Sequence, residues 1–346
     1  IREEDTWQIE KGGKYVVTRN GSALMAFTVP QEGAEAFHIT ASHCDSPTFK
    51  IKEDPEIADG PYVKLNVEGY GGMIMSTWLD RPLSVAGRLL VTENGHLAEK
   101  LVAIDGTMLV IPSVAIHMDR SVNQHKEWKV QKDMLPLYGM TGAKTPFMDV
   151  IAAAAKVNTE DILAHDLILY SRVPGTIWGE EREFISSPKL DDLQCAFVAL
   201  KGLLEAAPND ACVNVVALFD NEEVGSNTKQ GAMSTVLRDT LERMNAALGF
   251  SREDYHCAVA KSMLVSGDNA HALHPNRPEV ADAENRPVLG GGIVIKEAAN
   301  QKYCTDAVSA AVFKTICEKA EVPYQVFLNR SDILGGSTLG NISGTQ

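Results

Sequence analysis

Short apolar runs, each followed by polar residues, dominate the hydrophobic pattern of this chain. The clearest run covers residues 213–219 (VNVVALF), which is long enough for a buried strand but too short for a typical helix. Similar runs at 36–42 and 261–266 predict two further strands, and glycine-rich residues from 288 lead into another that ends at 295. Helically spaced apolar residues follow at 193–204 and 305–319. Strands that alternate with helices predict an α/β fold with a mostly parallel sheet flanked by helices.

The two predicted helices each show one apolar face. The first face groups Leu193, Phe197, Leu200 and Leu204. In the second helix, the side chains expected to point inward are Ala307, Val308, Ala311, Val312 and Ile316. Residues 251–254 (SRED) fit either the cap of a short helix or a polar loop.

Residues 61–180 differ from the rest of the chain. They contain short alternating runs, such as 62–67 and 89–91, and turn signals at Asn94-Gly95 and Asp105-Gly106 that predict hairpins. Residues 143–163 are expected to be partly helical. We therefore predict a discontinuous catalytic domain, 1–60 and 181–346, and an inserted β-rich domain, 61–180, that serves oligomerisation or acts as a lid.

The composition of the chain limits the kinds of partner that it can bind. The chain has 346 residues, 45% hydrophobic and 23% charged, with a net charge of −14. Such an acidic surface disfavours nucleic acid and anionic membranes, and no apolar stretch is long enough to span a membrane. Six cysteines without a C-x-x-C pair, together with the absence of a signal peptide pattern at the start, predict a cytoplasmic protein with reduced thiols.

Metal-binding residue types follow four of these segments. They are His43, Asp191 with Asp192, Glu222 with Glu223, and Asp268. Ligands of α/β proteins bind at the carboxyl ends of the strands. Imidazole and carboxylate donors suit Zn²⁺, with Mn²⁺ or Co²⁺ possible in the same geometry. One glutamate of the adjacent pair can hold a metal while the other moves a proton, and Asp45 can accept the ring N–H of His43 and so fix its tautomer.

Each of these residues also has a structural interpretation. His43 fits a strand-end histidine bonded to a carbonyl, Asp191 a helix N-cap, and Asp268 a turn residue. The four segments together favour a site. A competing cluster, Asp268 with His271 and His274 in a D-x-x-H-x-x-H pattern, remains open.

Several segments together resemble the aspartyl aminopeptidase family of dinuclear zinc metallo-aminopeptidases. The order and spacing of these segments make the resemblance specific, and it runs nearly end to end. The segments are 43–47 (HCDSP), 70–72 (YGG), 78–83 (WLDRPL), 187–193 (SPKLDDL), 220–226 (DNEEVGS), 268–276 (DNAHALHPN), 293–296 (IVIK) and 335–340 (GGSTLG).

The resemblance implies a zinc exopeptidase-like fold and a role for each site residue. It makes His43 and Asp268 ligands of one zinc, Asp191 the bridge between two Zn²⁺ ions, and Glu223 a ligand of the second. Glu222 is implied as the general base. The last ligand of the family is a histidine near the C-terminus, which we expect beyond Gln346. Asp192 and Cys44 depart from the family, where Asn and Thr are common.

Two further roles follow from the same resemblance. Lys296 is the candidate substrate-binding residue, because a lysine beside an acidic metal site attracts a substrate carboxylate. His117, in the inserted domain, is implied to reach a neighbouring subunit's active site and to help stabilise the tetrahedral intermediate. Such enzymes form large closed homo-oligomers, with a dodecamer implied here.

The sequence thus predicts a metal-dependent aminopeptidase that removes N-terminal residues, preferably Asp or Glu, from peptides through a metal-activated water with Glu222 as general base. One alternative keeps the site but prefers neutral N-terminal residues. Another, from a different class, is a non-catalytic, self-assembling shell that has lost a metal.

Overall fold

The chain divides into two compact units. The computed structural model describes residues 1–346 apart from 143–144, 208–209, 334, 337–341 and 343–346. Unit 1 comprises Ile1–Asp45 and Lys189–Gln346, and unit 2 comprises Ser46–Pro188. The start of the predicted helical stretch, 143–144, and residues 337–340 of the GGSTLG segment lie outside the described residues.

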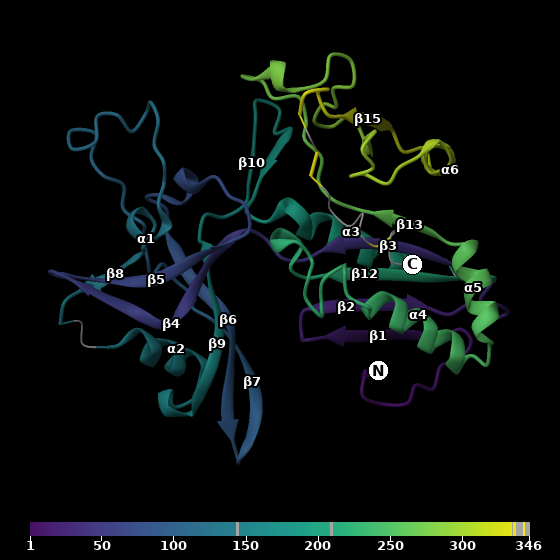
Figure 1. Cartoon of the computed structure of the whole chain (residues 1–346), viewed down its shortest axis with the longest axis horizontal. Helices are drawn as coiled ribbons and strands as arrows, with labels where there is room; N and C mark the ends of the chain where they lie inside the picture. Colours follow the sequence, from purple (N-terminus) through teal and green to yellow (C-terminus); the bar gives the residue numbers. More distant parts are fainter. Residues whose placement is uncertain (143–144, 208–209, 334, 337–341, 343–346) are drawn as a thin grey trace. The chain divides into compact units, whose positions relative to one another are not determined.

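Unit 1 is built on a five-stranded sheet in the order β1-β2-β12-β3-β13 (Figure 1). β12 and β13 run parallel to β3, whereas β2 is antiparallel to β12 and β1 to β2. A separate pair, β14 and β15, is parallel. The strands are β1 (Lys14–Arg19), β2 (Ala23–Thr28), β3 (Ala36–His43), β12 (Cys212–Phe219), β13 (Met263–Ser266), β14 (Ile293–Glu297) and β15 (Tyr324–Leu328).

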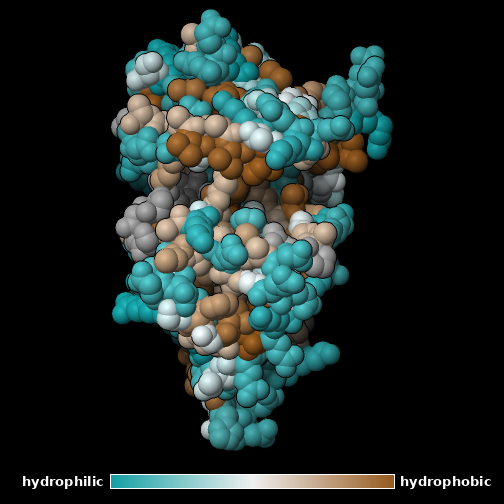
Figure 2. All heavy atoms as spheres, turned by 90° about the vertical axis from the view of Figure 1, so that its right-hand side faces the viewer, coloured by the Kyte–Doolittle hydropathy of each residue, from teal (hydrophilic) through white to brown (hydrophobic). Residues whose placement is uncertain are grey.

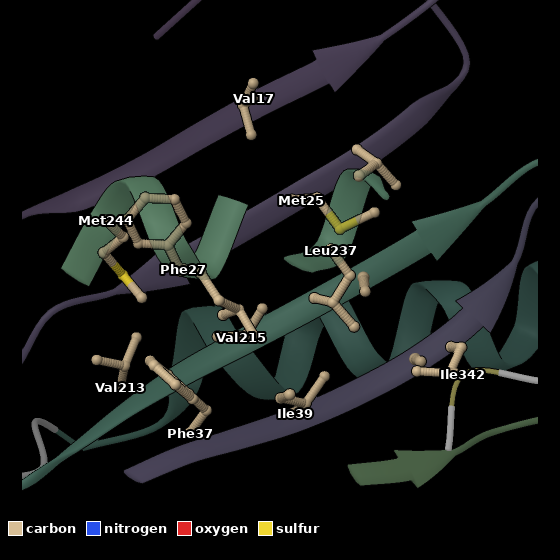
Figure 3. Packing of buried hydrophobic residues seen from close by; sticks show 14 of the residues in the cluster. Val17, Met25, Phe27, Phe37, Ile39, Val213, Val215, Leu237, Met244 and Ile342 are labelled. Carbon is tan, nitrogen blue, oxygen red and sulfur yellow. The ribbon is translucent and has the colours of Figure 1, made fainter. Parts of the chain in front are cut away.

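Helices cover both faces of this sheet, as the alternation of elements predicts. They are α3 (Leu190–Glu205), α4 (Val236–Ala247) and α5 (Arg252–Ala260). Unit 1 also contains α6 (Ala307–Lys319), which lies beside β15 in Figure 1, and the short 3-10 turns η3 (Glu222–Val224) and η4 (Pro278–Val280). Successive residues of β12 point to opposite faces. Val215 therefore joins the core formed with α4 and α5, and Val216 packs with Leu203 of α3. Figure 3 shows the first of these cores, with Phe27 and Phe37 of the sheet near Met244 and Leu237 of α4.

The predicted inward face of the second helix is wrong, and the apolar face expected in the first helix is mostly exposed. In α3, Phe197 and Leu204 are 66% and 64% exposed, while Ala196 and Leu203 are buried. In α6, Val308 is 71% exposed, and the buried residues are Ala310 and Cys317. Leu203, Leu200 and Ala199 pack on the sheet side of α3, so Phe197 and Leu204 lie off this face. Figure 2 shows hydrophobic residues at the surface on the side of the molecule where α5 and α6 lie.

The polar segment before α5 is a helix cap. Ser251 accepts a hydrogen bond from the N–H of Asp254, and the Asp254 side chain accepts one from the N–H of Ser251. This reciprocal pair is a capping box, which satisfies two N–H groups at the start of the helix.

Unit 2 is a six-stranded antiparallel sheet in the order β7-β6-β9-β4-β5-β8, with a separate hairpin of β10 and β11. The strands are β4 (Thr48–Asp59), β5 (Tyr62–Tyr70), β6 (Leu83–Glu93), β7 (His96–Ala103), β8 (Leu137–Met140), β9 (Ile162–Ser171), β10 (Thr176–Trp178) and β11 (Phe184–Ser186). The helices and 3-10 turns are η1 (Met75–Trp78), α1 (Val130–Asp133), α2 (Phe147–Ala155) and η2 (Thr159–Asp161).

The β-rich insertion predicted from hairpin signals is thus present, and it is wider than expected. The two units divide at Asp45/Ser46 and Pro188/Lys189, rather than at 60/61 and 180/181. The physical reason is that β4 pairs with β5 and β9. A strand held by its ladder on both sides belongs to the sheet that completes those hydrogen bonds.

Candidate metal centre

Three parallel strands bring the predicted site residues to one edge of the unit 1 sheet. Phe219, the last residue of β12, lies opposite His43, the last residue of β3, and Ser266 of β13 lies opposite Ala41. The chain leaves these ends through Glu222 and Glu223 after β12, and through Asp268 after β13. The start of α3 supplies Asp191. The carboxyl edge of a parallel sheet is where α/β folds bind ligands.

His43 lies at the centre of the group, with a side chain that is 2% exposed. Its Nε2 is 3.3 Å from Oδ1 of Asp191 and 4.0 Å from Oε2 of Glu222. Burial opposes the charged imidazolium, but hydrogen bonds with Asp191 and Asp45 outweigh it and raise the pKa of His43 to about 11. The bond with His43, in turn, lowers the pKa of Asp191. Without a metal, the protonated ring is thus the positive charge that balances these acids.

Asp45 links the two halves of the site. Its Oδ1 is 3.3 Å from Nδ1 of His43, and its side chain is 6% exposed. Each carboxylate oxygen also accepts a backbone hydrogen bond: Oδ1 from the N–H of Glu222 and Oδ2 from that of Glu223, both at 3.1 Å. These two N–H groups start the turn η3 and have no partner inside it, so Asp45 caps the turn from 177 residues away in the sequence.

The surroundings of the two adjacent glutamates raise the pKa values of both carboxyl groups. Burial, opposed by the positive charge of His43, raises the pKa of Glu222 to about 7. Burial and the charge of Glu222 raise the pKa of Glu223 to about 7 as well. Carboxyl groups with raised pKa values in a shared site gain most from a cation, which removes their mutual repulsion.

Lys296, at the end of β14, approaches the site from the side of Asp268. Its Nζ donates to the carbonyl of Asn269 at 2.9 Å and is 3.6 Å from Oδ2 of Asp268. Both Lys296 and Asp268 line a cavity of about 430 Å³ whose other lining residues are mostly apolar, among them Val265 and Phe313. The ammonium group therefore lies beside a carboxylate of the site and next to space within unit 1.

Asp192, noted in the sequence as the neighbour of Asp191 and as a departure from the family's Asn, is fully buried beside the site. Its Oδ2 accepts hydrogen bonds from the Ser42 hydroxyl at 2.5 Å and from the N–H of His43 at 3.3 Å. Its Oδ1 has no hydrogen-bond partner among the described atoms, and burial raises its pKa. Ser42 was not predicted, because a serine inside an apolar strand pattern carries no signal of its partner.

The donor atoms fit a divalent metal. Two groups, His43 with Asp191 and Asp268, and His43 with Glu222 and Glu223, each place their ligand atoms within 4.8 Å of one another. Imidazole nitrogen and carboxylate oxygen are zinc donors, and the raised carboxyl pKa values mark a site that favours added positive charge. All predicted ligands of the chain are thereby brought together.

Other candidate residues lie elsewhere. His271 and His274 join no such group in the described part of the chain; Nδ1 of His274 accepts the N–H of Asn276. The Cys44 thiol donates to the carbonyl of Phe219, and burial raises its pKa to about 12. His117 belongs to unit 2, where it is exposed in the segment between β7 and α1.

Imidazole and carboxylate donors grouped at the carboxyl ends of three parallel strands are the arrangement expected of a metal-dependent hydrolase. A family described as aminopeptidase I zinc metalloprotease (M18) matches residues 1–346. The chain belongs to the M18 aminopeptidase family, whose members are zinc metallo-aminopeptidases. No helix in the described ranges has both the length and the apolar character needed to cross a membrane.

Individual relatives agree. A probable M18 family aminopeptidase 2 of Clostridium novyi is 48% identical over all of this chain and 82% of its own length. Aspartyl aminopeptidase 4 of Saccharomyces cerevisiae is 36% identical over 99% of this chain and 79% of its own. The cryo-EM structure of the Ape4 and Nbr1 complex contains a chain that matches with a TM-score of 0.96 and 34% identity, covering 100% of this chain and 71% of that one.

Proposed function

We propose that this M18 aminopeptidase holds two Zn²⁺ ions and removes N-terminal Asp or Glu from peptides, with Glu222 as general base. The observation that carries the proposal is the meeting of His43, Asp191, Glu222, Glu223 and Asp268 at one sheet edge. His43 and Asp268 would hold one ion, Glu223 the other, and Asp191 both. Mn²⁺ or Co²⁺ suit the same donors.

Bound zinc would polarise the scissile carbonyl and make a water molecule in the site more acidic. The remaining steps belong to the chain's own residues. An Oε atom of Glu222 takes a proton from the attacking water, whose oxygen bonds to the carbonyl carbon. As the C–N bond breaks, Glu222 returns the proton to the leaving amine. Its pKa near 7 suits a group that both accepts and donates at neutral pH.

The preference for acidic residues is supported by two observations. Lys296 is the cation beside Asp268, and its Nζ can turn to the side-chain carboxylate of a substrate. In addition, a relative from Ricinus communis, 34% identical over 99% of this chain and 79% of its own length, is named a probable aspartyl aminopeptidase.

Substrate preference is tested with zinc-loaded enzyme and the anilides of Asp, Glu, Leu and Ala. Lys296→Ala should raise KM for Asp and Glu substrates by about tenfold or more, since a charge-assisted bond is lost, and should change KM for Leu little. Lys302→Ala is the matched control, because Lys302 is a second lysine that lines the same cavity. Equal losses for all four substrates would exclude Lys296 as the selector, and a wild-type preference for Leu would refute the acidic specificity.

We also propose a homo-oligomer in which unit 2 mediates assembly or forms a lid, and in which His117 of one copy serves the site of another. A solved S. cerevisiae mApe1 dodecamer, 27% identical over all of this chain, matches with a TM-score of 0.83. The exposed position of His117 supports the proposal. Cytoplasmic location is supported by the reduced thiols of Cys44, Cys195 and Cys317.

Mixing two inactive variants tests the shared site. His117→Ala lacks only the donated histidine, and Glu222→Gln lacks only the base. Co-assembled after dissociation, they should regain a measurable fraction of wild-type activity, because some Glu222 sites then receive His117 from a neighbour. Activity that stays at the sum of the separate variants, in mixtures shown to exchange subunits, would contradict a shared site.

A further inference from the structure

The loop that carries the two glutamates, residues 220–231, is closed by its own hydrogen bonds. The N–H of Asp220 donates to the carbonyl of Gln230 at 3.1 Å, so the two ends of the loop lie together. Asn221, Gly225 and Ser226 all have left-handed backbone conformations, with φ of 61°, 95° and 62°. A Cβ on Gly231 would lie 2.3 Å from the carbonyl oxygen of Ser226, so the returning chain touches the outgoing one.

Asn221 occupies the cap position of the turn η3 but does not cap it. Asparagine at this position usually accepts a hydrogen bond from the first turn, whereas here the side chain makes no such bond. Asp45 takes that role, as described above. The amide oxygen of Asn221 is therefore available for a different use.

That oxygen binds the returning half of the loop. Oδ1 of Asn221 accepts hydrogen bonds from the Thr228 hydroxyl at 2.7 Å and from Nε2 of Gln230 at 2.8 Å. The carbonyl oxygen of Asn221 accepts the N–H of Ser226 at 2.8 Å. One residue thus joins both halves of the loop immediately before Glu222.

We propose that Asn221, held by Thr228 and Gln230, is a positioning residue that sets the direction of the Glu222 carboxylate. The inference rests on the proposed role of Glu222 as general base. Asp45 fixes the backbone N–H groups of the glutamates, and Asn221 ties the residue before Glu222 to the returning half of the loop. A general base must lie within hydrogen-bond reach of the proton it takes, and a displacement of 1 Å can cost about 100-fold in rate.

The test compares loop variants with intact left-handed backbone. Asn221→Gly removes the amide but tolerates φ of 61°, and the double variant Thr228→Val with Gln230→Leu removes both donors. We expect kcat to fall roughly 10- to 100-fold, with KM within about twofold and zinc content unchanged. Thr228→Ser, which keeps the hydroxyl donor, should have a kcat close to that of the wild type. Thr235→Val, which removes a hydroxyl that donates to Asp239 at the start of α4, is the matched control.

A double-mutant cycle separates positioning from general structural support. In a Glu222→Gln background, Asn221→Gly should lower the residual rate by less than about twofold, because the group it positions has already been lost. Full additivity of the two effects, or a wild-type kcat for Asn221→Gly, would overturn the inference. High activity of Glu222→Gln alone would instead refute the proposed base, so the two failures are distinguishable.

Discussion

Asparagine in place of Asp45 should weaken metal binding without touching a metal ligand. The carboxylate accepts the N–H groups of Glu222 and Glu223, each at 3.1 Å, and lies 3.3 Å from Nδ1 of His43. Asparagine is almost isosteric, but it keeps a single acceptor oxygen. Its NH₂ group would face either a backbone N–H or the protonated ring, and neither can accept a hydrogen bond.

The expected magnitude follows from these contacts. A hydrogen bond to a charged acceptor contributes about 1.5–3 kcal/mol, and a buried donor left unpaired costs about 1–3 kcal/mol. Losing one bond at a side chain that is 6% exposed should therefore destabilise the metal-free fold by roughly 2–4 kcal/mol. Residues that orient metal ligands typically contribute 10- to 100-fold to metal affinity, and we expect zinc affinity to fall by about that factor.

Two measurements check this prediction. Competition with a chromophoric chelator gives the zinc affinity, and urea unfolding of the metal-free protein gives the free energy of unfolding. Asp105→Asn is the matched control: its carboxylate pairs with Arg172 but is 96% exposed, so the pair should contribute at most about 1 kcal/mol. If Asp45→Asn bound zinc as tightly as the wild type, the argument that Asp45 organises the site would be refuted.

Two other predictions concern the same unit. Because the pKa of His43 is about 11 in the metal-free site, zinc must displace its proton, so zinc affinity should fall about tenfold as the pH drops from 8 to 7. Titration calorimetry in buffers of different ionisation enthalpy should detect at least one released proton. A binding enthalpy that does not depend on the buffer would contradict a protonated His43. Phe219→Ala removes a fully buried ring at the end of β12 and should lower the free energy of unfolding by about 3–5 kcal/mol. The control Val16→Ala, at a residue that is 46% exposed, should change this free energy by less than about 1 kcal/mol. Equal effects of the two variants in urea unfolding would disprove the assigned core.

Much of this site could be predicted from the sequence, because apolar runs indicate strands and the polar residues that follow these runs mark the carboxyl ends of the strands. The run before Asp220 and the one before His43 became neighbouring parallel strands for this reason. The partners that hold the ligands could not be predicted. The bonds from Asp45 to the glutamate amides join residues far apart in the chain, and no local pattern encodes them.

The buried faces of the helices could not be predicted for a different reason. Hydrophobic periodicity identifies an apolar stripe but not what covers it. In α3, Phe197 and Leu204 belong to the apolar stripe, yet Leu203 is the residue buried against the sheet. A helix that is apolar on two sides offers two candidate faces, and periodicity alone does not say which of them packs on the sheet.

The point at which unit 2 enters the chain has a mechanical consequence. Unit 2 begins one residue after Asp45 and ends three residues before Asp191. Both of its covalent tethers thus run directly into groups that surround the imidazole of His43. Tension on these tethers would reach Asp45 and Asp191 within a few bonds, so a restraint on the inserted sheet should also affect how firmly these two residues hold His43.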